Sequence, residues 1–99
     1  MYNCTYSNNI NVEFDSKKAA SNLKKHGVAF EAASVALPDP LALVIEDPDA
    51  LGEARWLLLG MSDLGLLTVC YTLRDEETIR LISARKATLK EKKYYAQGI

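Results

Sequence analysis

The chain has 99 residues, 25% of them charged and 48% apolar, and a formal net charge of −1 at pH 7, which is typical of one globular domain with a single modest core. No apolar run approaches the ~20 residues of a membrane-spanning helix. The opening MYNCTYSNNI lacks the basic and apolar regions of a secretory signal, so we expect a cytoplasmic protein without a membrane partner.

Capping and stop signals predict two helices in the first third of the chain. Asp15 is a suitable N-cap for a helix over residues 16–26, and Gly27 suits its C-terminal cap. A second, short helix is predicted over residues 30–36, because Pro38 cannot continue it.

Four apolar segments separated by turn residues predict four consecutive β-strands. Consecutive strands with short connections form an antiparallel meander. The segments are residues 41–46, 55–62, 66–74 and 78–85. A capping box of Thr88 and Glu91 then begins a last helix that runs to about Gln97.

These elements predict an α+β fold: a four-stranded antiparallel meander with two N-terminal helices and one C-terminal helix. A short strand over residues 12–14 is expected to open the domain. We therefore assign residues 1–11 to an N-terminal extension and residues 12–99 to a single domain.

The middle hairpin decides how two arginines are placed. If Leu64-Gly65 is a two-residue loop, Arg55 lies directly opposite Arg74; a three-residue loop over residues 63–65 is the alternative. Like charges that face each other destabilise a sheet. We therefore expect compensation from a carboxylate such as Glu53 or from an anionic ligand.

The last hairpin adds a third arginine. A three-residue loop over residues 75–77 places Arg80 opposite Thr72, and side chains alternate along a strand, so Thr72 shares a face with Arg74. Together with Arg55, these arginines then form a cluster at one end of one sheet face. Because a slip of one residue moves a side chain to the other face, the cluster depends on both loop lengths.

Arg85 and Lys86 stand at the end of an apolar strand, in the stretch LISARKATLKE. Strict alternation places Arg85 on the face opposite to that of Arg80. A β-bulge near the strand end is a common way to turn a side chain toward a site, and it would bring Arg85 round. We expect Lys86 to extend into solvent.

Several motifs in order resemble the BrnT family of bacterial type II toxins. They are DSKKAASNLKKHGVAFEAA (residues 15–33), PDP (38–40), E-x-R-W (53–56) and IRLISARKAT (79–88), followed by Glu91 and Tyr95. The chain departs from the family in its first ten residues and in Thr72-Leu73-Arg74, where relatives often carry T-E-R. The lost carboxylate speaks against a mechanism with an acid at that position.

The resemblance implies a ribonuclease with a fold related to the RelE toxins. It also implies a BrnA-like antitoxin that binds DNA, with a ribbon-helix-helix domain, in a complex of two toxins and two antitoxins. The acidic segment 47–53 is then either a solvated loop or a contact for a basic antitoxin segment.

RNA cleavage without a metal needs a base for the 2′-hydroxyl, cations for the transition state and an acid for the leaving oxygen. Arginine binds phosphate through its planar fork, so Arg55, Arg74, Arg80 and Arg85 are the candidate catalytic cations. With one histidine and no CxxC pair, no zinc site is available. We expect neither a metal nor a cofactor.

His26, the only histidine, is the candidate base, although a residue in the last turn of a helix also interacts with its free carbonyls. Lys24 and Lys25 either supply the base, contact RNA or form a solvated helix face. Lys86 is a further candidate contact for RNA. The prediction is a metal-independent endoribonuclease that inhibits translation. The alternative is a catalytically inactive module whose basic face only binds an antitoxin.

Overall fold

The computed structural model describes residues 2–5, 11–48, 52 and 54–98. The elements are β1 Tyr2–Thr5, β2 Asn11–Phe14, α1 Ser16–His26, α2 Phe30–Ala36, β3 Leu43–Glu46, β4 Trp56–Ser62, β5 Gly65–Asp75, β6 Thr78–Lys86 and α3 Leu89–Gln97. The three predicted helices and the four predicted strands are all present, with ends that differ from the prediction by at most two residues. Within the described ranges, no helix is long and apolar enough to cross a membrane.

The prediction of a four-stranded antiparallel sheet is wrong in strand number and direction. The strands β2 to β6 form a mixed sheet, and β1 adds to its edge, in the order β1-β2-β6-β5-β4-β3. β2 runs parallel to β6, whereas every other pair is antiparallel. A parallel pair is joined by a long crossover and has no local turn signal, so the sequence pattern showed only the hairpins.

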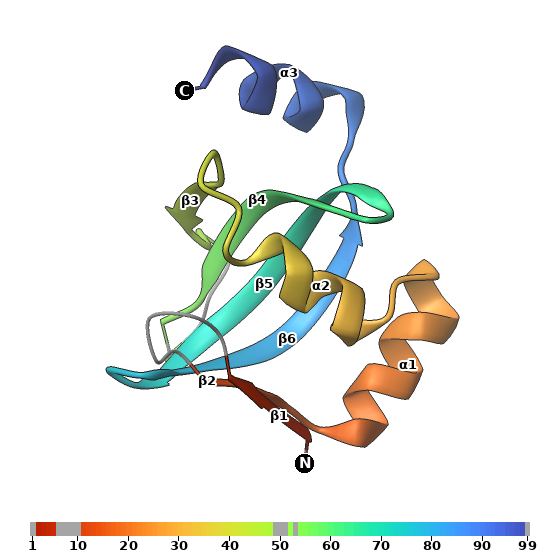
Figure 1. Ribbon diagram of the computed structural model, residues 1–99, viewed down its shortest axis with the longest axis vertical. Helices are drawn as coiled ribbons and strands as arrows, with labels where there is room; N and C mark the ends of the chain where they lie inside the picture. The colour runs from red at the N-terminus through yellow and green to blue at the C-terminus, as the bar shows by residue number, and fades with distance from the viewer. Residues whose placement is uncertain (1, 6–10, 49–51, 53, 99) are drawn as a thin grey trace.

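Residues 2–5, which we assigned to the N-terminal extension, form the edge strand β1, and Tyr2 lies opposite Phe14 of β2. In Figure 1 this strand lies beside β2 at the opposite end of the molecule from α3.

The turn of the middle hairpin lies one residue earlier than predicted, which shifts the pairing of β4 with β5 by two residues. Ser62 lies opposite Gly65, so the turn is Asp63-Leu64. The Ser62 hydroxyl donates to the Gly65 carbonyl at 2.9 Å, and Gly65 has φ of 99°, which favours glycine. Arg55 therefore does not lie opposite Arg74, and that prediction is wrong. A shift of two residues keeps every side chain on its expected face.

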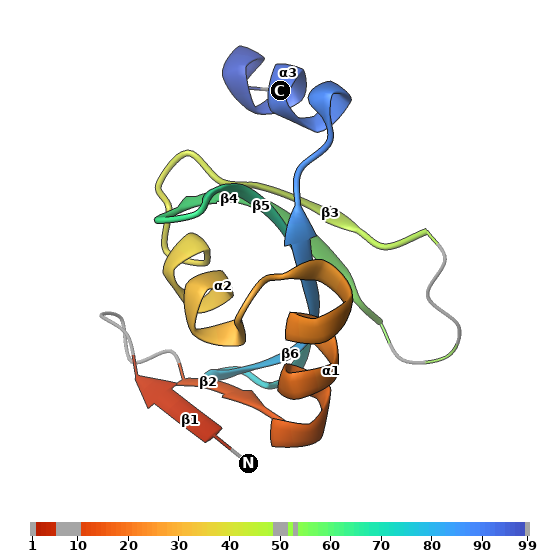
Figure 2. The ribbon, with the colours of Figure 1, turned by 90° about the vertical axis from the view of Figure 1, so that its right-hand side faces the viewer.

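The core lies between one face of the sheet and the helices α1 and α2 (Figures 1 and 2). Phe14 and Phe30 meet edge to face with ring centroids 5.1 Å apart. Gly60 lets α2 approach β4 closely, because a Cβ there would lie 2.4 Å from the carbonyl oxygen of Ala36. The fully buried large side chains are Val12, Val28, Phe30, Leu67, Val69 and Leu81.

The helix caps are those that the sequence predicts. The Asp15 side chain accepts a hydrogen bond from the amide of Lys17, and Gly27 ends α1 with φ of 69°. α3 begins with the capping box of Thr88 and Glu91. Unlike the other two helices, α3 has no buried residue among those described.

Candidate functional site

A β-bulge in β6 decides which side chains share the face of the sheet opposite α1 and α2, which we call the open face. Tyr71 lies opposite Leu81, whereas Cys70 lies opposite Ser83, so Ile82 is an extra residue in β6. A bulge of this kind reverses the alternation of the residues that follow it. Tyr71 and Leu81 face the core, so Cys70 and Ser83 face the other side.

The bulge turns Arg85 onto the open face. Arg85 lies opposite Thr68, and Arg80 lies opposite Thr72, which is the pairing that we predicted. The predicted three-residue loop is wrong, because Asp75 lies opposite Thr78: the turn is Glu76-Glu77, and Arg74 is an extra residue in β5 that restores the register. The two arginines are five residues apart along β6, a span of roughly 15 Å. The cationic strand end is therefore directed away from the core, toward a surface that a ligand can reach.

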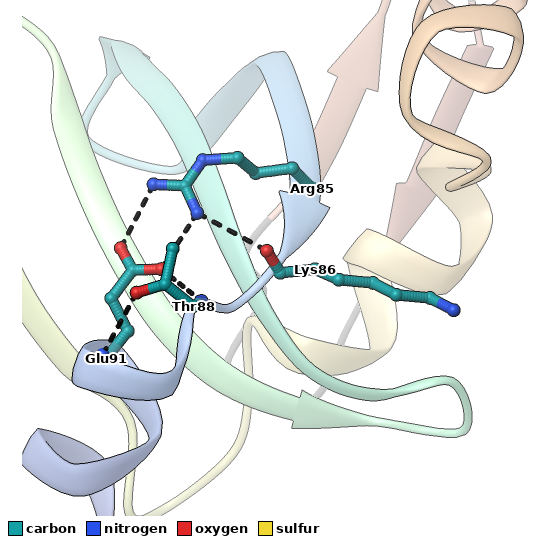
Figure 3. Close-up of polar contacts among 4 residues, drawn as sticks. All are labelled: Arg85, Lys86, Thr88 and Glu91. Atoms are coloured by element: carbon teal, nitrogen blue, oxygen red, sulfur yellow. Dashed lines mark hydrogen bonds and ion pairs between the residues drawn. The ribbon is translucent and has the colours of Figure 1, made fainter.

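Arg85 forms a two-pronged ion pair with Glu91 of α3 (Figure 3). Its Nη1 and Nη2 atoms lie 2.8 and 3.0 Å from the two carboxylate oxygens. The Arg85 hydrogen bonds lower the pKa of Glu91 to about 2, against partial burial, and the amide of Thr88 also donates to this carboxylate. The hydrogen bond to Glu91 likewise raises the pKa of Arg85. Lys86 points away from this pair and is exposed.

Arg74 also binds a carboxylate, through a single nitrogen, at the other end of the open face. Its Nη1 atom lies 2.7 and 2.8 Å from the two oxygens of Glu13. Glu13 is only 7% exposed, and its backbone lies beside that of Arg80 in the parallel register of β2 and β6. Hydrogen bonding to Glu13 raises the pKa of Arg74. Glu13 therefore neutralises Arg74, although Arg55 does not lie opposite it. Glu53, the carboxylate that we named to compensate such a pair, lies outside the described residues.

Arg55 lies just before β4, with its Nη2 atom 3.5 Å from Asp47 Oδ2. The Cys70 thiol lies 3.9 Å from the same carboxylate oxygen, and burial raises the pKa of the thiol. Arg80 is half-buried and has no ion-pair partner among the described residues. Of the four arginines, Arg80 is thus the one whose charge the described carboxylates leave unpaired.

The structure does not bring His26 and the lysines of α1 onto the open face. His26 and Lys25 line a hollow of about 210 Å³ together with Lys18 and the backbone region of Ile82 and Ser83. The hollow lies beside the part of β6 that extends past β2, where α1 ends in both ribbon views (Figures 1 and 2). Lys24 is exposed on the same helix.

The predicted site residues therefore form two groups. Arg55, Arg74, Arg80 and Arg85 lie on the open face, and His26 with Lys25 lies at the free edge of β6. Within the described ranges, no group of three or more His, Cys, Asp or Glu residues is placed to hold a metal ion.

A groove on the open face had no signal in the sequence. It has a volume of about 340 Å³, and Tyr94 of α3 borders it with Glu91 at its rim. The side chains at its base are Leu43 and Ile45 of β3 and Leu57 and Leu59 of β4. The sequence could not predict this groove, because the strand register decides which apolar side chains lie together on one face.

The family described as "Ribonuclease toxin, BrnT, of type II toxin-antitoxin system" matches residues 14–91, which is most of the chain. The chain belongs to the BrnT family. A solved structure, that of the ribonuclease toxin BrnT of Brucella abortus, aligns with a TM-score of 0.61 and 24% identity over 78% of this chain and 95% of that one. At that identity the likeness shows the fold. No curated protein matches the chain.

Two of the BrnT-like motifs bind each other in the structure. The side-chain amide of Asn22, in N-L-K-K-H-G-V, donates to the carbonyls of Ala84 and Val28 at 2.9 Å. Its oxygen accepts from the amide of Ala84, in I-S-A-R-K-A-T, at 3.0 Å. Asn22 thus occupies the place of a neighbouring strand at the free edge of β6, next to Arg85, a role that we did not predict.

The P-D-P motif and Tyr95 of this BrnT-family chain also meet. The Tyr95 hydroxyl and the amides of Leu41 and Met61 all donate to the Asp39 carboxylate. Desolvation disfavours the Asp39 anion, but these hydrogen bonds outweigh it and lower its pKa. Asp39 and Arg85 therefore hold α3 at two points, Tyr95 and Glu91.

Proposed function

We propose that this BrnT-family chain is a metal-independent endoribonuclease that inhibits translation by cutting RNA in the cytoplasm, with Arg80 and Arg85 as its phosphate-binding cations. The observation that carries the proposal is the bulge at Ile82, which turns Arg85 onto the face of Arg80. A bulge costs ladder hydrogen bonds and is typical of strands that aim a side chain at a site. We also expect this fold to be related to that of the RelE toxins.

The chemistry follows from the charges on the open face. The transition state of phosphodiester cleavage spreads negative charge over phosphate oxygens, and fixed guanidinium groups stabilise that charge. Arg80 is placed to do this without giving up a partner, whereas Arg85 must exchange Glu91 for phosphate. Because Arg80 and Arg85 lie roughly 15 Å apart along β6, they would bind different phosphates of one RNA strand, and one guanidinium group would stabilise the phosphate that is cleaved.

The base and acid must come from elsewhere. Glu91 has a pKa of about 2, so it is ionised at neutral pH and is too weak a base to take the proton of a 2′-hydroxyl. We assign proton transfer to His26, with Lys25 and Lys24 as contacts for the RNA backbone. RNA that crosses the free edge of β6 could contact the hollow that His26 lines and the open face together.

The type II family implies an antitoxin partner. We propose a BrnA-like antitoxin with a DNA-binding ribbon-helix-helix domain, in a complex of two toxins and two antitoxins. An antitoxin that inserted carboxylates between the arginines of the open face would silence the site, because it would fill the phosphate positions.

One observation favours the alternative, a module that binds an antitoxin and cleaves nothing. Arg55, Arg74 and Arg85 each contact a carboxylate of the chain itself. A face whose charges are largely neutralised attracts RNA less strongly than a free basic face.

The deciding experiment incubates the purified chain with total RNA in EDTA and compares two variants that break the same ion pair. Arg85→Ala removes the cation and should lower cleavage by roughly 10²- to 10³-fold. Glu91→Gln releases α3 equally but keeps Arg85, so cleavage should persist or rise. Circular dichroism checks that both variants fold.

Equal loss in the two variants would show that the ion pair acts only by holding α3, and it would overturn the assignment of Arg85. RNA that stays intact with the wild-type chain, in EDTA and also with added ribosomes, would favour the binding module. Cleavage that appears only when Mg²⁺ replaces EDTA would refute metal independence.

A further inference from the structure

The outer edge of β3 carries backbone groups that no strand of the described sheet binds. β3 is the last strand in the sheet order and pairs only with β4. The amide of Asp47 donates to the Arg55 carbonyl at 2.9 Å, so the ladder bonds of β3 continue at alternate residues, Ile45 and Leu43. Val44 and Glu46 therefore direct their N–H and C=O groups away from β4.

The side chains of this edge are unusually apolar for a sheet margin. Ile45 is 61% exposed and Val44 is 46% exposed, and Leu41, just before the strand, is 68% exposed. Proteins commonly protect an edge with lysine, proline or a bulge, and Leu43–Glu46 contains none of these. Ile45 also lines the apolar groove beneath Tyr94, so the exposed edge continues directly into a concavity.

The charges at the edge select the class of partner. Glu46 is exposed, and residues 41–48 include no base. Carboxylates repel an RNA backbone and attract lysine or arginine. A second copy that paired through its own β3 would bring the same carboxylate and no cation from residues 41–48, so a basic peptide segment fits the edge better than RNA or this self-association.

We propose that β3 accepts an extended segment of a protein partner as an additional strand of the sheet. Its apolar residues would alternate with lysine or arginine: the apolar side chains extend the wall of the groove beside Ile45, and the basic ones face Glu46. Backbone bonds to Val44 and Glu46 supply the affinity, and the alternation supplies the specificity. That this partner is the antitoxin rests on the proposed function.

The alternation fits the two faces of β3. Leu43 and Ile45 face the groove. Val44 lies opposite the core residue Leu58, so Val44 and Glu46 are on the core side of the sheet. A strand added beside β3 presents its own side chains to the same two faces. An alternating segment is therefore the one pattern that satisfies both the apolar groove and the carboxylate.

The test uses a fluorescent, end-capped peptide of roughly eight residues in which valine alternates with lysine. Val44→Pro removes an outward N–H and blocks strand addition, but leaves the bonds to β4 in place because that N–H does not take part in them. Its control is Val44→Thr, which keeps the N–H and the β-branch. By fluorescence anisotropy, Val44→Pro should raise the Kd about tenfold or more, and Val44→Thr should change it little.

A second variant does not depend on how proline is tolerated. Glu46→Lys should weaken the lysine peptide and strengthen a matched peptide in which glutamate replaces lysine. Binding that none of these variants changes, or no binding at millimolar peptide, would overturn the proposal. So would concentration-dependent dimerisation that Val44→Pro abolishes, since the edge would then serve a second copy.

RNA cleavage in the same preparations separates this proposal from the proposed function. A chain that cuts RNA, with peptide binding insensitive to Val44→Pro, refutes the β3 surface alone. A chain that cuts no RNA, with peptide binding that Val44→Pro abolishes, refutes the ribonuclease and supports the surface.

Discussion

Replacing Asn22 by alanine should cost the protein a large part of its stability. The side chain is 5% exposed and makes three hydrogen bonds, two to Ala84 and one to Val28, at 2.9 to 3.0 Å. Alanine leaves three backbone groups without these partners at a buried position. A buried bond lost in this way costs ~1 kcal/mol or more, so we expect a loss of about 2–4 kcal/mol from a total of roughly 5–15 kcal/mol.

The assay is urea unfolding followed by the fluorescence of Trp56, the single tryptophan. Ser21→Ala, on the exposed side of the same helix, is the matched control and should stay within about 0.5 kcal/mol of wild type. Asn22→Asp keeps the acceptor for Ala84 but sets a carboxylate against two carbonyls, so it should be at least as harmful at neutral pH.

A local effect should accompany the global one. Asn22 completes the free edge of β6, so the amides of Ala84 and Arg85 should exchange hydrogen faster in Asn22→Ala than in the Ser21→Ala control. If Asn22→Ala lost less than 1 kcal/mol, water or a neighbouring group would have to satisfy these carbonyls, and the strand-substitute role would be wrong.

Two further predictions concern packing and pH. Gly60→Ala places a methyl group 2.4 Å from the carbonyl oxygen of Ala36, so α2 must shift. In urea unfolding the variant should lose at least ~2 kcal/mol of stability, whereas the control Met61→Ala should not. Equal stabilities of the two variants would refute the close contact. The pKa of Glu91 is lowered from 4.5 to about 2, so its contribution is complete above pH 4.5 and disappears as the pH falls toward 2. After screening by solvent this contribution is about 1–2 kcal/mol, and Glu91→Gln should flatten the acid limb of the stability curve; an unchanged limb would contradict the ion pair.

The elements that the sequence predicted well are those with local causes. The helix over residues 16–26 begins at Asp15 and ends at Gly27 because both caps act within one turn. The pairing of Thr72 with Arg80 was predicted correctly although the turn was not, because the extra residue Arg74 in β5 offsets a turn that is one residue shorter than expected. The prediction for the Leu64-Gly65 loop failed because two neighbouring turn positions are almost equally favourable by composition, and the structure has the turn at Asp63-Leu64.

The candidate site was likewise predictable only in the features that are visible in the sequence itself. The sequence alone identified the cations, since arginine at strand ends and lysine on a helix are visible as residue types, and it identified the BrnT-like motifs. It could name a bulge as the means of turning Arg85, but it could not locate Ile82, because a bulge is defined by the partner strand.

By itself, the sequence determined the helices, the strand-rich second half and the family. Only the tertiary structure decided that β2 joins β6 in parallel, that Glu13 and Glu91 neutralise Arg74 and Arg85, and that His26 lies apart from the arginines. The physical reason is range: caps and turns act between residues a few positions apart, whereas Glu13 and Arg74 meet across 61 positions of sequence, through contacts that exist only once the sheet has formed.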